Sequence, residues 1–165
     1  MFRFKLNHKI LNNYCIFLLI TVFTILGNQF AFGQSYQVSC NTINTDGSIV
    51  IEIWNPRSGN SYRAEAARKD AVYAIIFKGT VSNVNCSAVS PLLDTQQKVK
   101  KFEDIESNFF GKKGDWNQFA HLDAANMSGE NIKDRGKTYK ITIAKESLRS
   151  YLIENKIIDS LMKGF

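Results

Sequence analysis

The chain has 165 residues and a formal net charge of +6, from 21 Lys and Arg against 15 Asp and Glu. Arg3, Lys5 and Lys9 lie in the first 33 residues, which hold no acid, so the remaining 132 residues (165 − 33) have a net charge of +3 (18 basic against 15 acidic side chains). This small surplus is typical of an ordinary soluble domain and argues against a nucleic-acid-binding protein. The length suits one domain with its own core.

Residues 1–33 have the three parts of a secretory signal peptide. A basic segment is followed by an apolar run at 14–26 and then by small residues that end at Gly33. The run of 13 residues is shorter than the roughly 20 that a membrane-spanning helix needs. A single membrane anchor is the alternative if Ile10 and Leu11 extend the run. We expect cleavage after Gly33 and an exported protein that is periplasmic, associated with the outer membrane or extracellular.

Two cysteines, Cys40 and Cys86, lie beyond the leader. An even number of cysteines in an exported chain predicts a disulfide, and two cysteines allow only one pairing. Two buried free thiols are the alternative. A zinc site is disfavoured, because the cysteines are 46 positions apart and His121 is the only histidine beyond the leader. The sequence therefore predicts a disulfide, with no metal and no cofactor.

The first expected elements are two strands. Residues 36–40 alternate apolar and polar side chains, and residues 48–54 are rich in β-branched and aromatic side chains. Asp46-Gly47 between them is a strong turn signal, so we expect a hairpin. Pro56 then ends the sheet segment, because proline cannot donate to a strand ladder.

Two helices separated by an irregular connection are expected next. The first spans 61–77, with Ser61 as its N-cap and Gly79 at its end. Residues 80–93 form the connection, and 95–109 form the second helix. The small side chains on the apolar face of the first helix favour close packing on a sheet. This face consists of Ala64, Ala67, Ala71, Ala74 and Ile75.

The last third of the chain predicts one strand and a closing helix. Apolar residues recur every three positions over 116–122, a run too short to distinguish a helical turn from a packed loop. Residues 126–136 are polar and predict a surface loop, and 137–144 alternate as a strand. A helix follows at 145–155. The apolar pattern then continues over 157–165, which predicts a docked C-terminal segment.

This order of elements predicts a single α+β domain over residues 34–165. We expect a small, mostly antiparallel sheet of three to four strands. Two to three helices should pack on one face of that sheet.

No catalytic set stands out in the sequence. His121 is the only candidate base, and a pairing with a cysteine conflicts with the expected disulfide. A glycosidase needs two carboxylates across one cleft. The acids at 103–106 lie on the charged flank of a predicted helix, and Asp115 with Asp123 is the other pair. A hydrolase is therefore a remote alternative, and we expect no catalytic residues and no enzymatic activity.

Two tryptophans and a basic cluster are the candidate binding residues. Trp54 and Trp116 are candidates for contact with a glycan or a peptide, although a tryptophan at a strand end more often caps the core. The lysines at 98–101 and 112–113 lie beside phenylalanines with core spacing. Acids interrupt this cluster, so a solvated face is favoured over one that binds an anionic polymer, a phospholipid or a nucleic acid.

Two segments resemble known families. AEAARKDAVYAIIFKG at 64–79 and KTYKITIAKESLRSYLIENKIIDSLMKGF at 137–165 are similar to small exported proteins of Bacteroides-type bacteria without an assigned activity. The strand that feeds an alanine-rich helix also resembles the N-terminal envelope domains of the LPP20 lipoprotein and the flagellar-assembly T protein. Both resemblances imply a non-enzymatic envelope module and transfer no catalytic residue. We therefore predict an exported structural or interaction component of the cell envelope, with an unknown envelope protein or glycan as partner. A glycan- or peptide-binding module that uses exposed tryptophans is the alternative.

Overall fold

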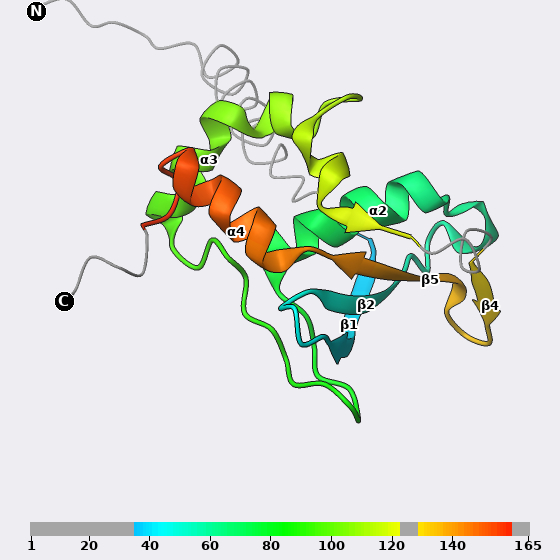
Figure 1. Cartoon of the computed structure of the whole chain (residues 1–165). Helices are drawn as coiled ribbons and strands as arrows, with labels where there is room; N and C mark the ends of the chain where they lie inside the picture. Colours follow the sequence, from blue (N-terminus) through cyan, green and yellow to red (C-terminus); the bar gives the residue numbers. More distant parts are fainter. Residues whose placement is uncertain (1–34, 123–128, 160–165) are drawn as a thin grey trace, which may run out of the picture. The chain divides into compact units, whose positions relative to one another are not determined.

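The computed structural model describes residues 35–122 and 129–159, so the predicted signal peptide at 1–33 and the last apolar residues, 160–165, lie outside the described ranges. Figure 1 shows the arrangement of the elements. They are the strands β1 (Gln37–Ile43), β2 (Ile49–Trp54), β3 (Ala120–His121), β4 (Glu130–Ile132) and β5 (Gly136–Ile143), the helices α2 (Ala64–Tyr73), α3 (Gln96–Phe109) and α4 (Lys145–Glu154), the 3-10 turns η1 (Gly59–Ser61) and η3 (Asp115–Gln118), and the π-helical turn η2 (Ala74–Lys78).

The strands form one antiparallel sheet with the order β1-β2-β5-β3, and β4 also pairs with β5. β3 and β4 lie along the same edge of β5, where Ala120 opposes Ile143 at one end and Ile132 opposes Gly136 at the other. The sheet therefore has five strands, slightly more than the three to four predicted. β3 escaped prediction because a strand of two residues shows no periodic pattern. β4 escaped it because Glu130–Ile132 falls in the polar stretch at 126–136 that was expected to be a surface loop.

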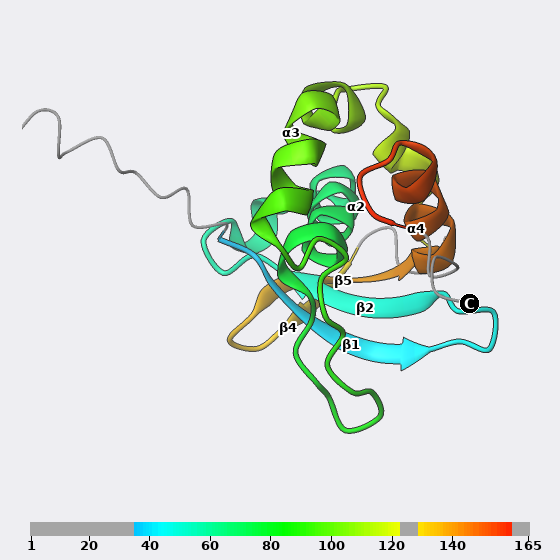
Figure 2. The same ribbon diagram turned by 90° about the vertical axis from the view of Figure 1, so that its left-hand side faces the viewer.

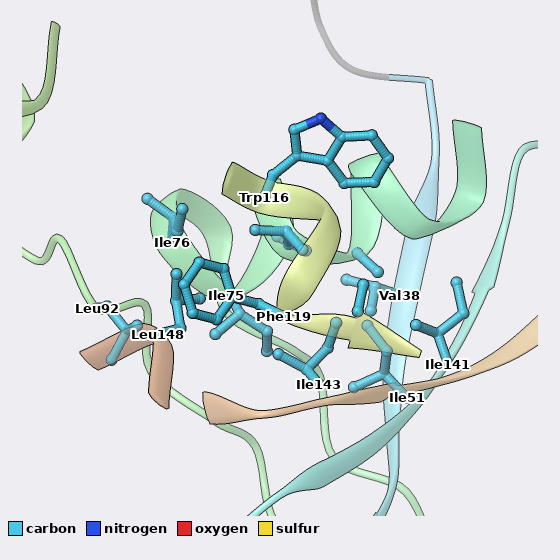
Figure 3. Packing of buried hydrophobic residues seen from close by; sticks show 14 of the residues in the cluster. Val38, Ile51, Ile75, Ile76, Leu92, Trp116, Phe119, Ile141, Ile143 and Leu148 are labelled. Carbon is cyan, nitrogen blue, oxygen red and sulfur yellow. The ribbon is translucent and has the colours of Figure 1, made fainter. Parts of the chain in front are cut away.

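The α+β class is confirmed, with helices α2, α3 and α4 on one face of the sheet (Figure 2). Alternation along β2 and β5 turns one set of side chains toward the helices, and these side chains are almost completely buried. Ala67 and Ala71 on α2 have no exposed surface, which allows close approach of α2 to the sheet. Figure 3 shows sheet residues Val38, Ile51, Ile141 and Ile143 together with Ile75, Ile76 and Phe119 of the helical layer.

The hairpin between β1 and β2 is confirmed. Gly47 has φ +81°, and Asp46 accepts hydrogen bonds from the backbone N–H and the hydroxyl of Ser48 at 2.9 and 2.7 Å. These bonds from Ser48 hold the pKa of the exposed Asp46 carboxyl below its usual value. The Asp-Gly signal therefore acts through both the glycine conformation and an aspartate that bonds its own turn.

The first helix starts later than predicted. Ser61 is not its N-cap, because it belongs to the η1 turn, where its hydroxyl donates to the carbonyl of Ser58. Arg63 caps α2 instead, without a side-chain hydrogen bond. The end at Gly79 is confirmed: this residue has φ +73°, and a Cβ atom there would lie 2.3 Å from a backbone carbonyl oxygen of residue 89.

The other helices follow the prediction closely. Thr95 caps α3 by accepting a hydrogen bond from the backbone N–H of Lys98, and α4 spans ten of the eleven residues expected. Ile157 and Ile158 after α4 are 4% and 6% exposed, so the chain stays packed to the end of the described range. The expectation of a docked segment beyond Asp159 falls outside the described residues.

Candidate functional site

The predicted disulfide is present between Cys40 of β1 and Cys86 of the loop at 80–93, with their Cα atoms 5.6 Å apart. The loop runs beside the edge strand, because the backbone N–H of Cys40 donates to the carbonyl of Val81 at 2.9 Å. Figure 2 shows the loop projecting past β1. Val84 near its tip is 95% exposed. The disulfide thus fastens a projecting loop to one edge of the sheet.

The two tryptophans are not exposed, which corrects the expectation of open stacking surfaces. Trp54 is 9% exposed, and the guanidinium carbon of Arg135 lies 4.5 Å from the centroid of its ring. Trp116 is 3% exposed, its indole N–H donates to the carbonyl of Gly111, and Arg68 lies 5.7 Å from its ring centroid. Tertiary contacts with arginines therefore occupy the aromatic faces that a sugar would need.

A surface pocket of about 500 Å³ lies between the start of α2, the η3 turn and β3. We call it the Arg68 pocket. Ala64 and Leu122 supply its apolar lining beside the buried indole of Trp116. Its polar lining comes from Glu65, Arg68, Lys112, Asn117 and His121. The fold therefore brings Trp116 and His121, singled out separately in the sequence, to one hollow.

Arg68 is held firmly in place by backbone carbonyls. Its Nε and Nη2 donate to the carbonyl of Ala120 at 2.9 and 2.7 Å, and Nη2 also donates to the carbonyl of Asn117 at 2.8 Å. A guanidinium has five N–H donors, so these three bonds leave both N–H groups of Nη1. Within the described ranges, these two groups have no hydrogen-bond acceptor. Arg68 thus fixes η3 and β3 against α2 and keeps one nitrogen without an acceptor among the described residues.

The other charged side chains of the pocket are exposed. Glu65 belongs to the first turn of α2, and Lys112 lies in the turn that follows α3. Neither of them, nor Arg68, makes an ion pair within 4.0 Å in the part of the chain that the structure describes. The pocket therefore combines two cationic side chains with one separate carboxylate.

Sequence reasoning missed Arg68 and Glu65 as site residues. Both lie off the apolar face of a predicted helix, where charged side chains are normally solvated. Nothing in the local pattern shows that a carbonyl 52 positions away orients the guanidinium. In the sequence, Lys112 stands out only as part of a basic cluster.

Among the described residues, none of the acids singled out in the sequence lines this pocket. Asp115 accepts a hydrogen bond from the hydroxyl of Tyr151 at 2.9 Å. Burial and then this bond raise the pKa of Tyr151 to about 12. Glu103 and Asp104 are exposed on α3, and Asp123 lies outside the described residues.

A second surface pocket, of about 530 Å³, lies between the loop at 80–93 and the start of α4. Two of its three cations are engaged locally, because Lys98 pairs with Asp94 and Arg149 with Glu146, which leaves Lys145. The Arg68 pocket has no such local neutralisation among its described residues, which makes it the better candidate for a charged ligand.

A chain of hydrogen bonds through Asp70, Tyr62 and Tyr139 connects α2 with β5. The hydroxyl of Tyr62 donates to Asp70 at 2.8 Å, and the hydroxyl of Tyr139 donates to the carbonyl of Tyr62 at 2.9 Å. Burial raises the pKa of Asp70 above its usual value, although the bond from Tyr62 opposes this shift. The hydroxyl of Tyr36 is buried without a hydrogen-bond partner among the described residues.

In the described ranges, no cluster of three or more His, Cys, Asp and Glu side chains is placed to hold a metal ion. None of the helices there has the length and apolar character to cross a bilayer. No protein-family model, curated protein or solved structure matches the chain, so the family resemblance drawn from the sequence stays a prediction.

Proposed function

We propose that the protein is an exported, non-enzymatic interaction module of the cell envelope that engages its partner at the Arg68 pocket. The observation that carries this proposal is the arrangement of Arg68, Lys112 and Glu65 around one hollow, with none of the three in an ion pair among the described residues. In a concave binding site, a few well-positioned polar or charged groups fix the orientation of the bound molecule.

The rigidity of the pocket supports a binding role. Arg68 is oriented by two carbonyls, and its neighbour Trp116 is buried beneath it. A side chain fixed before binding loses little conformational entropy when the ligand arrives. Arg68 therefore needs no large rearrangement to accept a partner.

Export is supported by two independent features. The first 33 residues have the composition of a secretory leader, and Cys40 is bonded to Cys86 as expected in an oxidising compartment. Intact-mass spectrometry of protein from its native cells tests this part. We expect a chain that begins at Gln34 and lacks two hydrogens on sulfur, whereas a full-length or fully reduced chain would contradict export.

Site-specific photo-crosslinking in intact native cells tests the binding role. A benzophenone side chain is placed at Asn117, which is exposed and lines the pocket, or at Gln97, which is exposed near the start of α3. Gln97 serves as the distant control, because α3 is roughly 20 Å long and Lys112 of the pocket lies just beyond its other end. We expect an adduct with an envelope component from position 117 only. No adduct, or the same adduct from both positions, refutes the proposed function.

A further inference from the structure

We propose that the Arg68 pocket binds an acidic sugar, a ring with hydroxyl groups and one carboxylate, as part of an envelope glycan. This inference rests on the proposed function, because it names the ligand of the same pocket. Its basis is the particular mixture of hydrogen-bonding side chains that Arg68, Glu65, Lys112 and Asn117 bring together.

The carboxylate is selected by two cationic side chains from different elements. Arg68 offers the two N–H groups of Nη1, and Lys112 offers an ammonium with three donors. Neither has a carboxylate within 4.0 Å in the described part of the chain. Hydrogen bonds between such cations and a carboxylate are short and roughly twice as strong as neutral ones. The pocket therefore favours a ligand with a negative charge.

Glu65 separates a sugar acid from a simple anion. It repels a compact dianion such as sulfate, and a peptide of acidic residues offers it no ring hydroxyl as a hydrogen-bond donor. Ring hydroxyls, however, donate to a carboxylate and accept from an amide. At the pocket wall, the Glu65 carboxylate is the acceptor and the Asn117 amide is the donor. The two ring nitrogens of His121 add a further donor or acceptor. A single carboxylate among several hydroxyls meets this set best.

The shape of the site favours a sugar over a peptide. Extended and helical peptides are commonly recognised along an open strand edge or in an apolar groove. This site is instead a pocket of about 500 Å³, and its apolar lining is limited to Ala64, Leu122 and the indole beneath Arg68. That volume is typical of small-molecule sites. Trp116 then serves to support Arg68 rather than to stack on the ligand.

The test measures binding of four probes to the purified, oxidised protein by backbone amide chemical shifts. The probes are trigalacturonate, neutral galactotriose, triglutamate and inorganic sulfate. We expect trigalacturonate to shift the amides of Lys112, Asn117 and His121. The other three probes should bind at least about tenfold more weakly, which corresponds to about 1.4 kcal/mol.

Three variants separate the sugar from a general anion. Lys112→Ala should weaken trigalacturonate binding about tenfold, whereas Lys113→Ala, the exposed neighbour outside the pocket, should leave it unchanged. Glu65→Ala should also weaken trigalacturonate binding several-fold through loss of a hydroxyl acceptor. At a general anion site, removal of this carboxylate strengthens binding instead. Amide spectra of each variant without ligand verify that its fold is retained.

The outcomes distinguish this inference from the proposed function. If position 117 crosslinks in cells but trigalacturonate fails to bind, the acidic sugar is wrong and the interaction module stands. Equal binding of triglutamate or sulfate, or tighter binding by Glu65→Ala, overturns the sugar in the same way. If trigalacturonate binds as expected but no crosslink forms in cells, the proposed function fails while the pocket chemistry holds.

Discussion

Reduction of the disulfide between Cys40 and Cys86 should remove a large part of the stability of this protein. The two cysteines are 46 positions apart, and the chain-entropy relation for a loop of that length gives about 4 kcal/mol. Domains of ordinary stability unfold with about 5–15 kcal/mol, so the loss is severe. For a domain of this size it corresponds to a fall in melting temperature of about 10–15 °C.

The perturbation is best applied to one molecule in two redox states. Cys40 has no exposed surface, so its replacement also removes packing, whereas reduction leaves both sulfur atoms in place. Urea unfolding followed by circular dichroism, with and without a phosphine reductant, gives the difference in the free energy of unfolding. The double variant Cys40→Ala/Cys86→Ala is the control, and its unfolding curve should not respond to the reductant.

Equal stability of the two redox forms would contradict stabilisation by loop closure. If the oxidised and reduced proteins unfold at the same urea concentration, although thiol titration shows that the bond was broken, the 46-residue closure does not constrain the unfolded chain. The stability would then come from the sheet and helix packing alone. A difference near 4 kcal/mol in the wild type and none in the double variant supports the loop-closure account.

Three further predictions concern the fold. Gly79→Ala should lower the free energy of unfolding in urea by about 3 kcal/mol, because its Cβ would lie 2.3 Å from a backbone oxygen. Gly59→Ala, also at positive φ but with open space around it, should lower it by about 1 kcal/mol. Equal losses in the two variants would contradict this expectation. Tyr139→Phe should cost about 1 kcal/mol through its buried hydrogen bond, and Tyr36→Phe should cost nothing, so a larger loss at Tyr36 would reveal a partner for its hydroxyl. Because the pKa of Asp70 is raised in the folded protein, the folded state binds more protons than the unfolded chain just above the usual Asp pKa of about 3.9. The free energy of unfolding should therefore fall as pH rises through that range. If Asp70→Asn leaves this pH dependence unchanged, Asp70 is not its source.

Local patterns were sufficient for most elements. The Asp-Gly turn, the β-branched strand at 48–54 and the alanine face of the first helix each depend on neighbours within a few residues, and the structure confirms them. The helix start is the informative error. Ser61 has the right side chain for an N-cap, but the η1 turn uses its hydroxyl for a bond inside that turn, so α2 begins at Ala64.

The added strands escaped local reasoning for a different reason. β3 has two residues and β4 has three, too few to show a period of two. Both become strands because β5 offers them an unpaired edge. Pairing with a partner that is distant in sequence, rather than intrinsic preference, decides such short segments.

The sequence alone determined the α+β class, the hairpin and the identity of the disulfide partners, since periodicity, turn chemistry and a count of two cysteines are local or combinatorial facts. Which polar side chains share a pocket depends instead on how distant segments pack together. Arg68 acquires its orientation from carbonyls 49 and 52 positions away, and both tryptophans lose their open faces to arginines. Long-range packing sets these contacts, and no pattern within a few residues encodes them.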